Sequence, residues 1–212
     1  MKTLAFFFIT FLSVNLIFGQ STKKLKSQLI NYIDSEEKTL IGISNKIWNA
    51  AEIAFQEKIS AQTLITYAIE NGFNVEEKVA SIPTAFVASY GSGKPIIGIL
   101  GEFDALPGIS QKPKSIKDPL IKGGAGHGCG HNMFGTASLG AAVAVKKLIE
   151  EGKLKGTVKF FGTPAEEKYF GKLWMVRAGL FDDLDVCLDW HPSDQIEANV
   201  QTTLALVDFK VE

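Results

Sequence analysis

Titratable side chains gather in four short segments of the sequence, and each segment is expected at the end of a strand or the start of a helix. The four segments are Glu102-Phe103-Asp104, His127–Asn132, Glu166-Glu167 and Asp189-Trp190-His191. In open α/β sheets, ligands bind outside the carboxyl ends of the strands. Segments that bring His, Cys, Asp and Glu side chains to this rim predict a polar site large enough for a metal ion.

The glycine-rich segment before Asn132 has the most specific pattern. Its glycines alternate with His127, Cys129 and His131, and glycine lets the backbone bend so that close-set side chains point at one centre. Thiolate, imidazole and carboxylate form a borderline-soft ligand set that suits Zn²⁺. A plain turn before a helix would also explain the glycines. Phosphate binding at a helix N-terminus is another alternative, although the Lys-Ser/Thr ending of a P-loop is absent.

The two cysteines leave further alternatives open. Neighbouring histidines can lower the pKa of a thiol, so Cys129 is also a candidate nucleophile. A nucleophile, however, gives the carboxylates no role. Cys187 lies in an apolar strand and is expected to be a small buried hydrophobic residue. A Cys129–Cys187 disulfide remains a structural alternative.

The adjacent acids Glu166 and Glu167 follow a predicted strand end. Two neighbouring carboxylates usually point apart into solvent. If one of them binds a metal ion, the other can lie over the bound water. The ion lowers the pKa of that water toward ~7 and the carboxylate accepts its proton, which is the division of labour that hydrolysis needs. His191 ends a strand and is either a further ligand or a core histidine.

Helical and strand patterns alternate along the chain. Helices are expected over 21–55 with a break near 34–37, over 60–70, 132–151 and 170–178; strands are expected over 73–79, 85–90, 95–100, 157–162, 185–190 and from 200 to 211. Gly91-Ser92-Gly93 is expected to form a hairpin turn between the strands at 85–90 and 95–100. The alternation predicts an α/β domain with a largely parallel sheet. Residues 105–126 lack periodicity, which is typical of a functional loop.

Composition excludes several classes of protein. The 22 Lys and Arg residues nearly balance the 23 Asp and Glu residues, for a net charge of -1. A nucleic-acid binder would normally carry a basic excess. Hydrophobic residues make up 46% of the chain, which is typical of a globular core, and two cysteines are too few for a disulfide scaffold.

Residues 1–20 have the pattern of a secretory signal peptide. Lys2 supplies the positive charge, an apolar run extends from Leu4 to Phe18, and Gly19 is a small residue suited to cleavage. The run is shorter than the ~20 apolar residues that a membrane-spanning helix needs. We therefore expect export and cleavage rather than a membrane anchor, with a mature chain of residues 21–212 that works outside the cytoplasm.

Four ordered motifs resemble one enzyme family. They are GEFDALPG at 101–108, GHGCGHN at 126–132, PAEE at 164–167 and His191-Pro192. They resemble the co-catalytic metallopeptidase family, which includes aminoacylases, glutamate carboxypeptidases and N-acyl-amino-acid amidohydrolases. The motifs are most similar to those of the aminobenzoyl-glutamate hydrolase (B-subunit) subgroup, and the resemblance covers nearly all of 25–212. It implies a three-layer α/β catalytic domain with a mostly parallel, mixed sheet between helices.

The resemblance also implies residue roles. Two zinc or manganese ions would be held by four ligands: Cys129, His131, Glu167 and His191. Cys129 would bridge the two ions. Glu166 matches the general base, and Asp104 matches the acidic residue that orients or supports the site. His127 belongs to the motif but is not usually a ligand, so we expect it to help position the ligands without binding the metal itself.

Two departures from the family pattern concern Asn132 and Glu102, where the amidohydrolases commonly carry Asp. They suit the aminobenzoyl-glutamate subgroup but leave the role of Glu102 open. The third departure is length, because family members are about twice as long and insert a lid and dimerisation domain before returning with one more histidine ligand. We therefore expect an N-terminal part of the catalytic domain, inactive alone, from a protein that forms a homodimer through the lid domain.

The expected function is hydrolysis of a small amide by metal-activated water. The substrate would be an N-acyl or N-aroyl amino acid, or a dipeptide-like amide. One alternative is an exported metal- or ligand-binding fragment without activity. Another is a cysteine-dependent hydrolase, which should survive removal of metal ions by a chelator.

Overall fold

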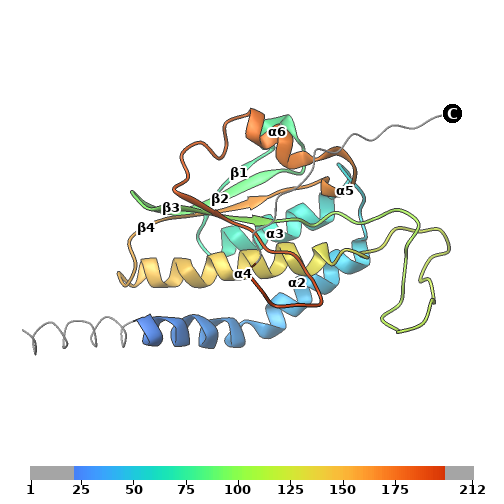
Figure 1. The fold of residues 1–212 in the computed structure, drawn as a ribbon, viewed down its shortest axis with the longest axis horizontal. Coiled ribbons are helices and arrows are strands. Elements are labelled where there is room, and N and C mark those ends of the chain that lie inside the picture. The colour runs from blue at the N-terminus through green and yellow to red at the C-terminus, as the bar shows by residue number, and fades with distance from the viewer. Residues whose placement is uncertain (1–21, 199–212) are drawn as a thin grey trace, which may run out of the picture.

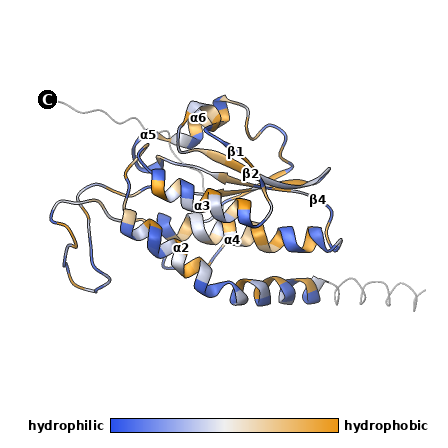
Figure 2. Cartoon of the chain, turned by 180° about the vertical axis from the view of Figure 1, so that it is seen from behind, coloured by the Kyte–Doolittle hydropathy of each residue, from blue (hydrophilic) through white to orange (hydrophobic). Residues whose placement is uncertain are grey.

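The computed structural model describes residues 22–198. The expected signal peptide and the expected strand from 200 to 211 lie outside these described residues. A helix at 22–35 comes first, and a turn at Glu36 separates it from α2, as the break in the sequence pattern predicts. Blue and orange alternate along this first helix in Figure 2, as expected for an amphipathic helix on the surface.

A five-stranded mixed sheet lies between helices (Figure 1). Its strands are β1 (Asn74–Glu77), β2 (Phe86–Ser92), β3 (Ile96–Gly101), β4 (Gly156–Gly162) and β5 (Val186–Leu188), in the order β1-β2-β4-β3-β5. The strands β4, β3 and β5 are mutually parallel, whereas β2 is antiparallel to both of its neighbours. The carboxyl ends of three strands therefore meet at one edge of the sheet.

Helices cover both faces of the sheet, which confirms the expected three layers. The helices are α2 (Glu37–Ala50), α3 (Lys58–Glu70), α4 (His131–Glu150), the single turn α5 (Glu166–Tyr169) and α6 (Gly171–Arg177), with a 3₁₀ turn η1 at Val79–Ser81. In Figure 1, α2, α3 and α4 lie on one side of the sheet and α6 lies on the other.

Alternating side chains of the central strands supply two apolar clusters, one on each face. Phe160 of β4 packs into the cluster beneath α3 and α4, and the next residue, Phe161, packs into the cluster with Met175 of α6. Ile99 and Leu100 of β3 divide in the same way. Because successive side chains of a strand point to opposite faces, an uninterrupted apolar run fits a strand that is covered on both sides.

The expected hairpin between β2 and β3 is wrong, because β4 lies between these two strands. β2 pairs with β4 along its whole length, from Phe86 opposite Gly162 to Ser92 opposite Gly156. The three-residue Gly-containing connection is short enough for a hairpin, but the two strands that flank it each pair with β4 and not with each other. Phe160 and Phe161 are fully buried, so β4 takes the central position, where both of its faces leave water.

The expected burial of Cys187 is also wrong. Within the described residues β5 is an edge strand, all three of its residues are exposed, and both Cys129 and Cys187 are free thiols. The sequence pattern identifies an apolar strand but not its neighbours, and an edge position leaves such a strand partly open to solvent.

Gly135, near the start of α4, has no room for a side chain. A Cβ atom there would lie 2.6 Å from the backbone oxygen of Glu102, far inside normal van der Waals separation. Alanine in a helix normally stabilises by about 0.5–1 kcal/mol relative to glycine, but overpacking costs typically 1–3 kcal/mol. We expect Gly135→Ala to lower the free energy of unfolding of the full-length protein, measured by urea titration.

The matched control for this prediction is Gly42→Ala in α2. A Cβ at Gly42 meets no heavy atom within 4 Å, so this variant is expected to be slightly more stable than the wild type. If both variants change stability in the same direction, close packing of α4 against the end of β3 is not what excludes a side chain at Gly135.

Candidate metal centre

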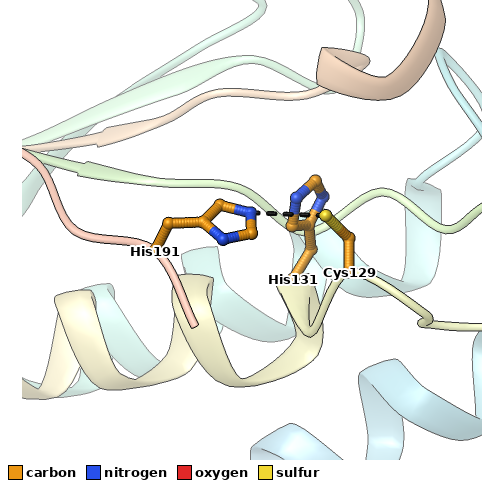
Figure 3. Close-up of side chains that lie close together, drawn as sticks. All are labelled: Cys129, His131 and His191. Atoms are coloured by element: carbon orange, nitrogen blue, oxygen red, sulfur yellow. Dashed lines mark hydrogen bonds between the residues drawn. The ribbon is translucent and has the colours of Figure 1, made fainter. Parts of the chain in front are cut away.

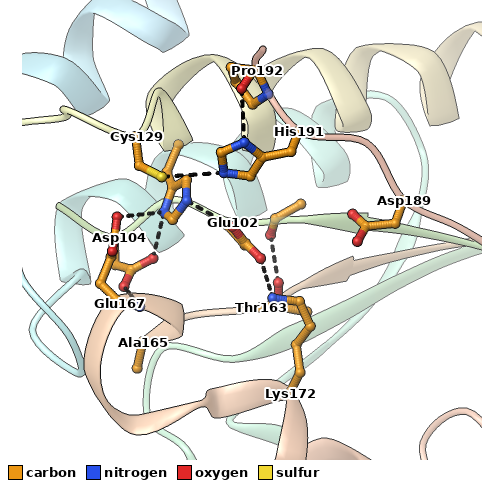
Figure 4. Close-up of polar contacts among 12 residues, drawn as sticks. Glu102, Asp104, Cys129, Thr163, Ala165, Glu167, Lys172, Asp189, His191 and Pro192 are labelled. Carbon is orange, nitrogen blue, oxygen red and sulfur yellow. Dashed lines mark hydrogen bonds and ion pairs between the residues drawn. The ribbon is translucent and has the colours of Figure 1, made fainter. Parts of the chain in front are cut away.

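Three strand ends and one helix start converge at the carboxyl edge of the sheet (Figure 4). Glu102 and Asp104 follow β3, Glu166 and Glu167 follow β4, and His191 follows β5. α4 begins at His131, directly after Cys129 and Gly130. Reciprocal backbone hydrogen bonds between Leu106 and Gly126, at 3.0 and 2.9 Å, close the base of the long loop. This contact brings the glycine-rich segment back beside the end of β3.

His131 lies at the centre of this cluster and is fully buried. Its Nδ1 donates to Asp104 Oδ1 at 2.9 Å, because a carboxylate can only accept. Its Nε2 lies 2.9 Å from Glu102 Oε2, with which it forms an ion pair when the ring is protonated. Burial alone lowers the pKa of His131, but the hydrogen bond to Asp104 and the charges of Glu102 and Asp104 outweigh burial and raise that pKa to about 10.

Cys129 and His191 approach each other next to His131 (Figure 3). Cys129 Sγ lies 3.3 Å from His191 Nε2. His191 Nδ1 donates to the carbonyl oxygen of Pro192 at 2.9 Å, which leaves the Nε2 lone pair facing the sulfur. The Trp190 indole donates to Ser138 Oγ at 2.9 Å, so the segment after β5 is fixed against α4 and the imidazole is held toward the cluster.

Asp104 connects the imidazole to the acidic pair. Its Oδ1 accepts from His131, and its Oδ2 accepts from the backbone N–H of Glu167 at 2.9 Å. The Glu167 carboxylate lies 3.9 Å from His131 Nδ1. Asp104 is almost fully buried, so this arrangement supports a positioning role rather than contact with a substrate.

The donor set fits divalent cations. The ligand atoms of Cys129, His131 and His191 lie within 4.8 Å of one another, and so do those of Glu102, His131 and Glu166. Glu102 Oε2, His131 Nε2 and Glu167 Oε1 are buried without a hydrogen-bond partner; the first two are close but not aligned for a hydrogen bond. Buried polar atoms are normally satisfied, and a cation in the second group would satisfy Glu102 Oε2 and His131 Nε2. Glu167, a predicted ligand, belongs to neither group. Sulfur and imidazole donors suit zinc, while carboxylates also accept manganese.

The thiol of Cys129 does not have the properties of an activated nucleophile. Burial and the neighbouring Glu167 carboxylate raise the pKa of this thiol to about 11. Reactive cysteines instead lie in electropositive surroundings that lower their pKa. A metal ligand agrees better with this acidic environment than a nucleophile does.

His127 lies away from the donor atoms. Its Nε2 donates to the carbonyl oxygen of Ile47 in α2 at 3.1 Å, and its ring stacks near Trp48. This contact holds the glycine-rich segment against α2. The placement agrees with a supporting role rather than ligation.

The folded chain adds three residues to the description of the site: Lys172, Glu102 and Glu57. Lys172 of α6 donates to Glu102 Oε1 and thereby balances one of the buried carboxylates. Glu102, whose role was open, lies within the donor set. Glu57 is fully buried and accepts from the backbone N–H of Ala165 at 2.9 Å. Neither Lys172 nor Glu57 belongs to a motif, so only the folded chain shows that they face the site.

Ala165 has an unusual backbone conformation next to the acidic pair. Its φ of 60° and ψ of 35° are left-handed, which costs a residue with a Cβ roughly 1–2 kcal/mol. Such strain persists only where the surroundings determine the conformation, and it clusters at active sites. The turn directs Glu166 and Glu167 away from the line of β4.

A model of peptidase family M20/M25/M40 matches residues 98–208 of the chain. The matched range contains all four titratable segments. No helix among residues 22–198 combines the length and apolar character required to cross a membrane.

Curated proteins with similar sequences are hydrolases. The chain is 46% identical over 161 residues to the p-aminobenzoyl-glutamate hydrolase (B-subunit) of Escherichia coli strain K12, and 32% identical over 197 residues to human Xaa-Arg dipeptidase. The alignments cover 76% and 81% of this chain but only 34% and 39% of those proteins. The chain therefore spans a little over a third of the length of these relatives.

A solved structure confirms the fold class. A dinuclear metal binding peptidase of Bacillus subtilis from the M20 family superposes with a TM-score of 0.65 at 24% sequence identity, over 76% of this chain and 44% of that one. The family model and the curated relatives confirm the resemblance that the four motifs indicate.

Proposed function

Because the chain belongs to peptidase family M20/M25/M40, we propose that the full-length protein is a metal-dependent amidohydrolase. Its substrates would be N-acyl or N-aroyl amino acids, or dipeptide-like amides such as aminobenzoyl-glutamate. The observation that carries this proposal is the convergence of donor atoms in two groups that share His131, one with Cys129 and His191 and one with Glu102 and Glu166. The Glu167 carboxylate lies beside them, 3.9 Å from His131 Nδ1.

As the sequence motifs imply, Cys129, His131, Glu167 and His191 would hold two zinc or manganese ions. Bound cations would polarise the amide carbonyl and make water a stronger acid. The dinuclear metal binding peptidase from Bacillus subtilis supports the number of ions. Asp104 fixes the Nδ1–H tautomer of His131 and thereby directs the Nε2 lone pair into the site.

Glu166 is the proposed general base. It begins α5 and is half-buried, with a carboxylate oxygen within 4.8 Å of the donor atoms of Glu102 and His131. Its carboxylate accepts a proton from the attacking water as the new C–O bond forms. It then delivers that proton to the leaving nitrogen as the C–N bond breaks, giving a carboxylic acid and an amine.

A pocket beside Glu166 suits the acyl side of such a substrate. It has a volume of about 300 Å³ and is lined by Glu166, Phe170, Lys172 and Leu173. Phe170 and Leu173 are both exposed, so they offer apolar contacts to an aromatic or aliphatic acyl group. We also propose that the protein is exported, on the signal-peptide pattern of residues 1–20.

The test is amine release by the full-length protein from p-aminobenzoyl-glutamate, hippurate, N-acetyl-cysteine and an Xaa-Arg dipeptide. We expect cleavage of at least one amide, loss of cleavage after dialysis against EDTA, and recovery when Zn²⁺ or Mn²⁺ is added. A protein that binds the cations but cleaves none of the four would instead support the inactive binding alternative.

A further inference from the structure

We propose that Glu57 is a positioning residue of this site: its buried carboxylate holds the backbone of Ala165 so that Glu166 and Glu167 face the metal donors. The inference rests on the proposed function, because it assigns Glu57 a role toward the metal centre. Glu57 itself does not reach the donor atoms, and it acts through the peptide that precedes the acidic pair.

Glu57 joins three parts of the chain inside the protein. It lies at the N-terminus of α3 and has no exposed surface. Its Oε1 accepts from the Ala165 N–H at 2.9 Å, across 108 residues of sequence. Its Oε2 accepts from the hydroxyl of Thr84, which is also buried, at 3.0 Å. Both carboxylate oxygens therefore have partners, and one of those partners is the strained turn before the acidic pair.

The Ala165 peptide determines where the acidic turn begins. The Ala165 carbonyl accepts from the N–H groups of Tyr169 and Gly171, at 3.2 and 3.3 Å. Its N–H points the other way, to Glu57. An acceptor at that N–H holds the left-handed conformation of Ala165, and this conformation sets the direction in which Glu166 and Glu167 leave β4.

The segment 52–57, which connects α2 to α3 and includes Glu57, also contacts the other end of α5. The ring of Phe55 stacks on Tyr169, with centroids 5.0 Å apart and an interplanar angle of 10°. The connection also reaches the end of β3, because Ala105 N donates to the Glu52 carbonyl at 2.8 Å. Residues 52–57 therefore touch both strand ends that carry acids of the site, and Asp104 links those ends again through Glu167 N.

Burial of a carboxylate at this position is unfavourable in free energy. An apolar side chain could fill the same space, so packing does not explain why the residue is a glutamate. Burial raises the pKa of Glu57 to about 7. An apolar side chain of similar size would fill the space without that cost, but it would leave the Ala165 N–H without an acceptor. A glutamine keeps a carbonyl oxygen at the end of the same side chain, so it can replace Glu57 as the acceptor.

The experiment measures cation affinity of the metal-stripped full-length protein by calorimetric titration with Zn²⁺ and with Mn²⁺. Glu57→Leu removes the acceptor, Glu57→Gln retains it, and Thr84→Val removes the other hydrogen bond of the same carboxylate without touching Ala165. Loss of a residue that orients metal ligands typically weakens metal binding roughly 10- to 100-fold. We expect this loss in Glu57→Leu, and wild-type affinity in Glu57→Gln and Thr84→Val.

Thermal unfolding of each variant separates positioning from stability. If Glu57→Leu and Thr84→Val unfold at lower temperature but both bind cations as the wild type does, Glu57 is a structural residue only and the inference is overturned. Should Glu57→Leu fail to fold, Glu57→Asp provides the same comparison, because the shorter side chain withdraws the carboxylate from Ala165. A wild-type protein that binds neither cation would refute the proposed function itself, before any variant is compared.

Discussion

Replacing Glu166 by glutamine is expected to abolish turnover by the full-length protein while its divalent cations stay bound. The amide keeps the size of the side chain but cannot accept the proton of the attacking water. General-base catalysis typically contributes about 10²–10⁴-fold, so kcat should fall by that factor. Steady-state kinetics and metal analysis of the same purified sample provide the two measurements.

The neighbouring variant Glu167→Gln is the matched control for this experiment. The Glu167 carboxylate has an unpartnered buried oxygen close to His131, so its loss should appear in the metal content and in the affinity for Zn²⁺ or Mn²⁺. Two adjacent acids with different readouts would support the division into base and ligand. Retained turnover in Glu166→Gln would remove Glu166 from the role of base.

Replacing Cys129 by alanine is expected to remove both metal binding and activity. The sulfur lies 3.3 Å from His191 Nε2 and within 4.8 Å of a ligand atom of His131, where it can serve as a ligand together with these two imidazoles. Loss of a direct ligand should weaken binding by more than the roughly 10- to 100-fold effect of losing an outer partner. Metal content after dialysis, measured by atomic spectrometry, is the primary readout.

Cys187→Ala supplies the control, because Cys187 is the other free thiol and lies exposed on β5. We expect wild-type metal content and activity in this variant. The cysteine-dependent alternative makes a different prediction: Cys129→Ala would be inactive with its cations bound, and the wild type would remain active after chelation. That pair of results would refute the metal-dependent mechanism.

Local sequence patterns were sufficient to place the candidate ligands on their elements. Cys129 and His131 flank the start of α4, and Glu166 follows β4, as expected from strand and helix patterns. The rule that ligands gather at the carboxyl ends of parallel strands then predicted that the segment ending in His191 would lie near them, while the residues alone left His191 as either a ligand or a core histidine. The structure brings these residues together across 62 residues of sequence.

Strand neighbours were not predictable in the same way. A short glycine-containing connection after β2 indicates a turn but not whether its flanking strands pair. β4 separates them because its phenylalanines need cover on both faces. The apolar pattern at 185–190 likewise indicates a strand but not its place in the sheet. It therefore could not show that Cys187 lies exposed on an edge strand.

The sequence by itself determined which chemical groups are available and which strand or helix end carries each of them, because motifs and periodicity are properties of neighbouring residues. Only the tertiary structure decided which groups meet and what holds them. The contacts of Glu102 with Lys172 and of Glu57 with Ala165 join residues 70 and 108 positions apart. Such contacts arise from strand order and close packing, which no local pattern encodes.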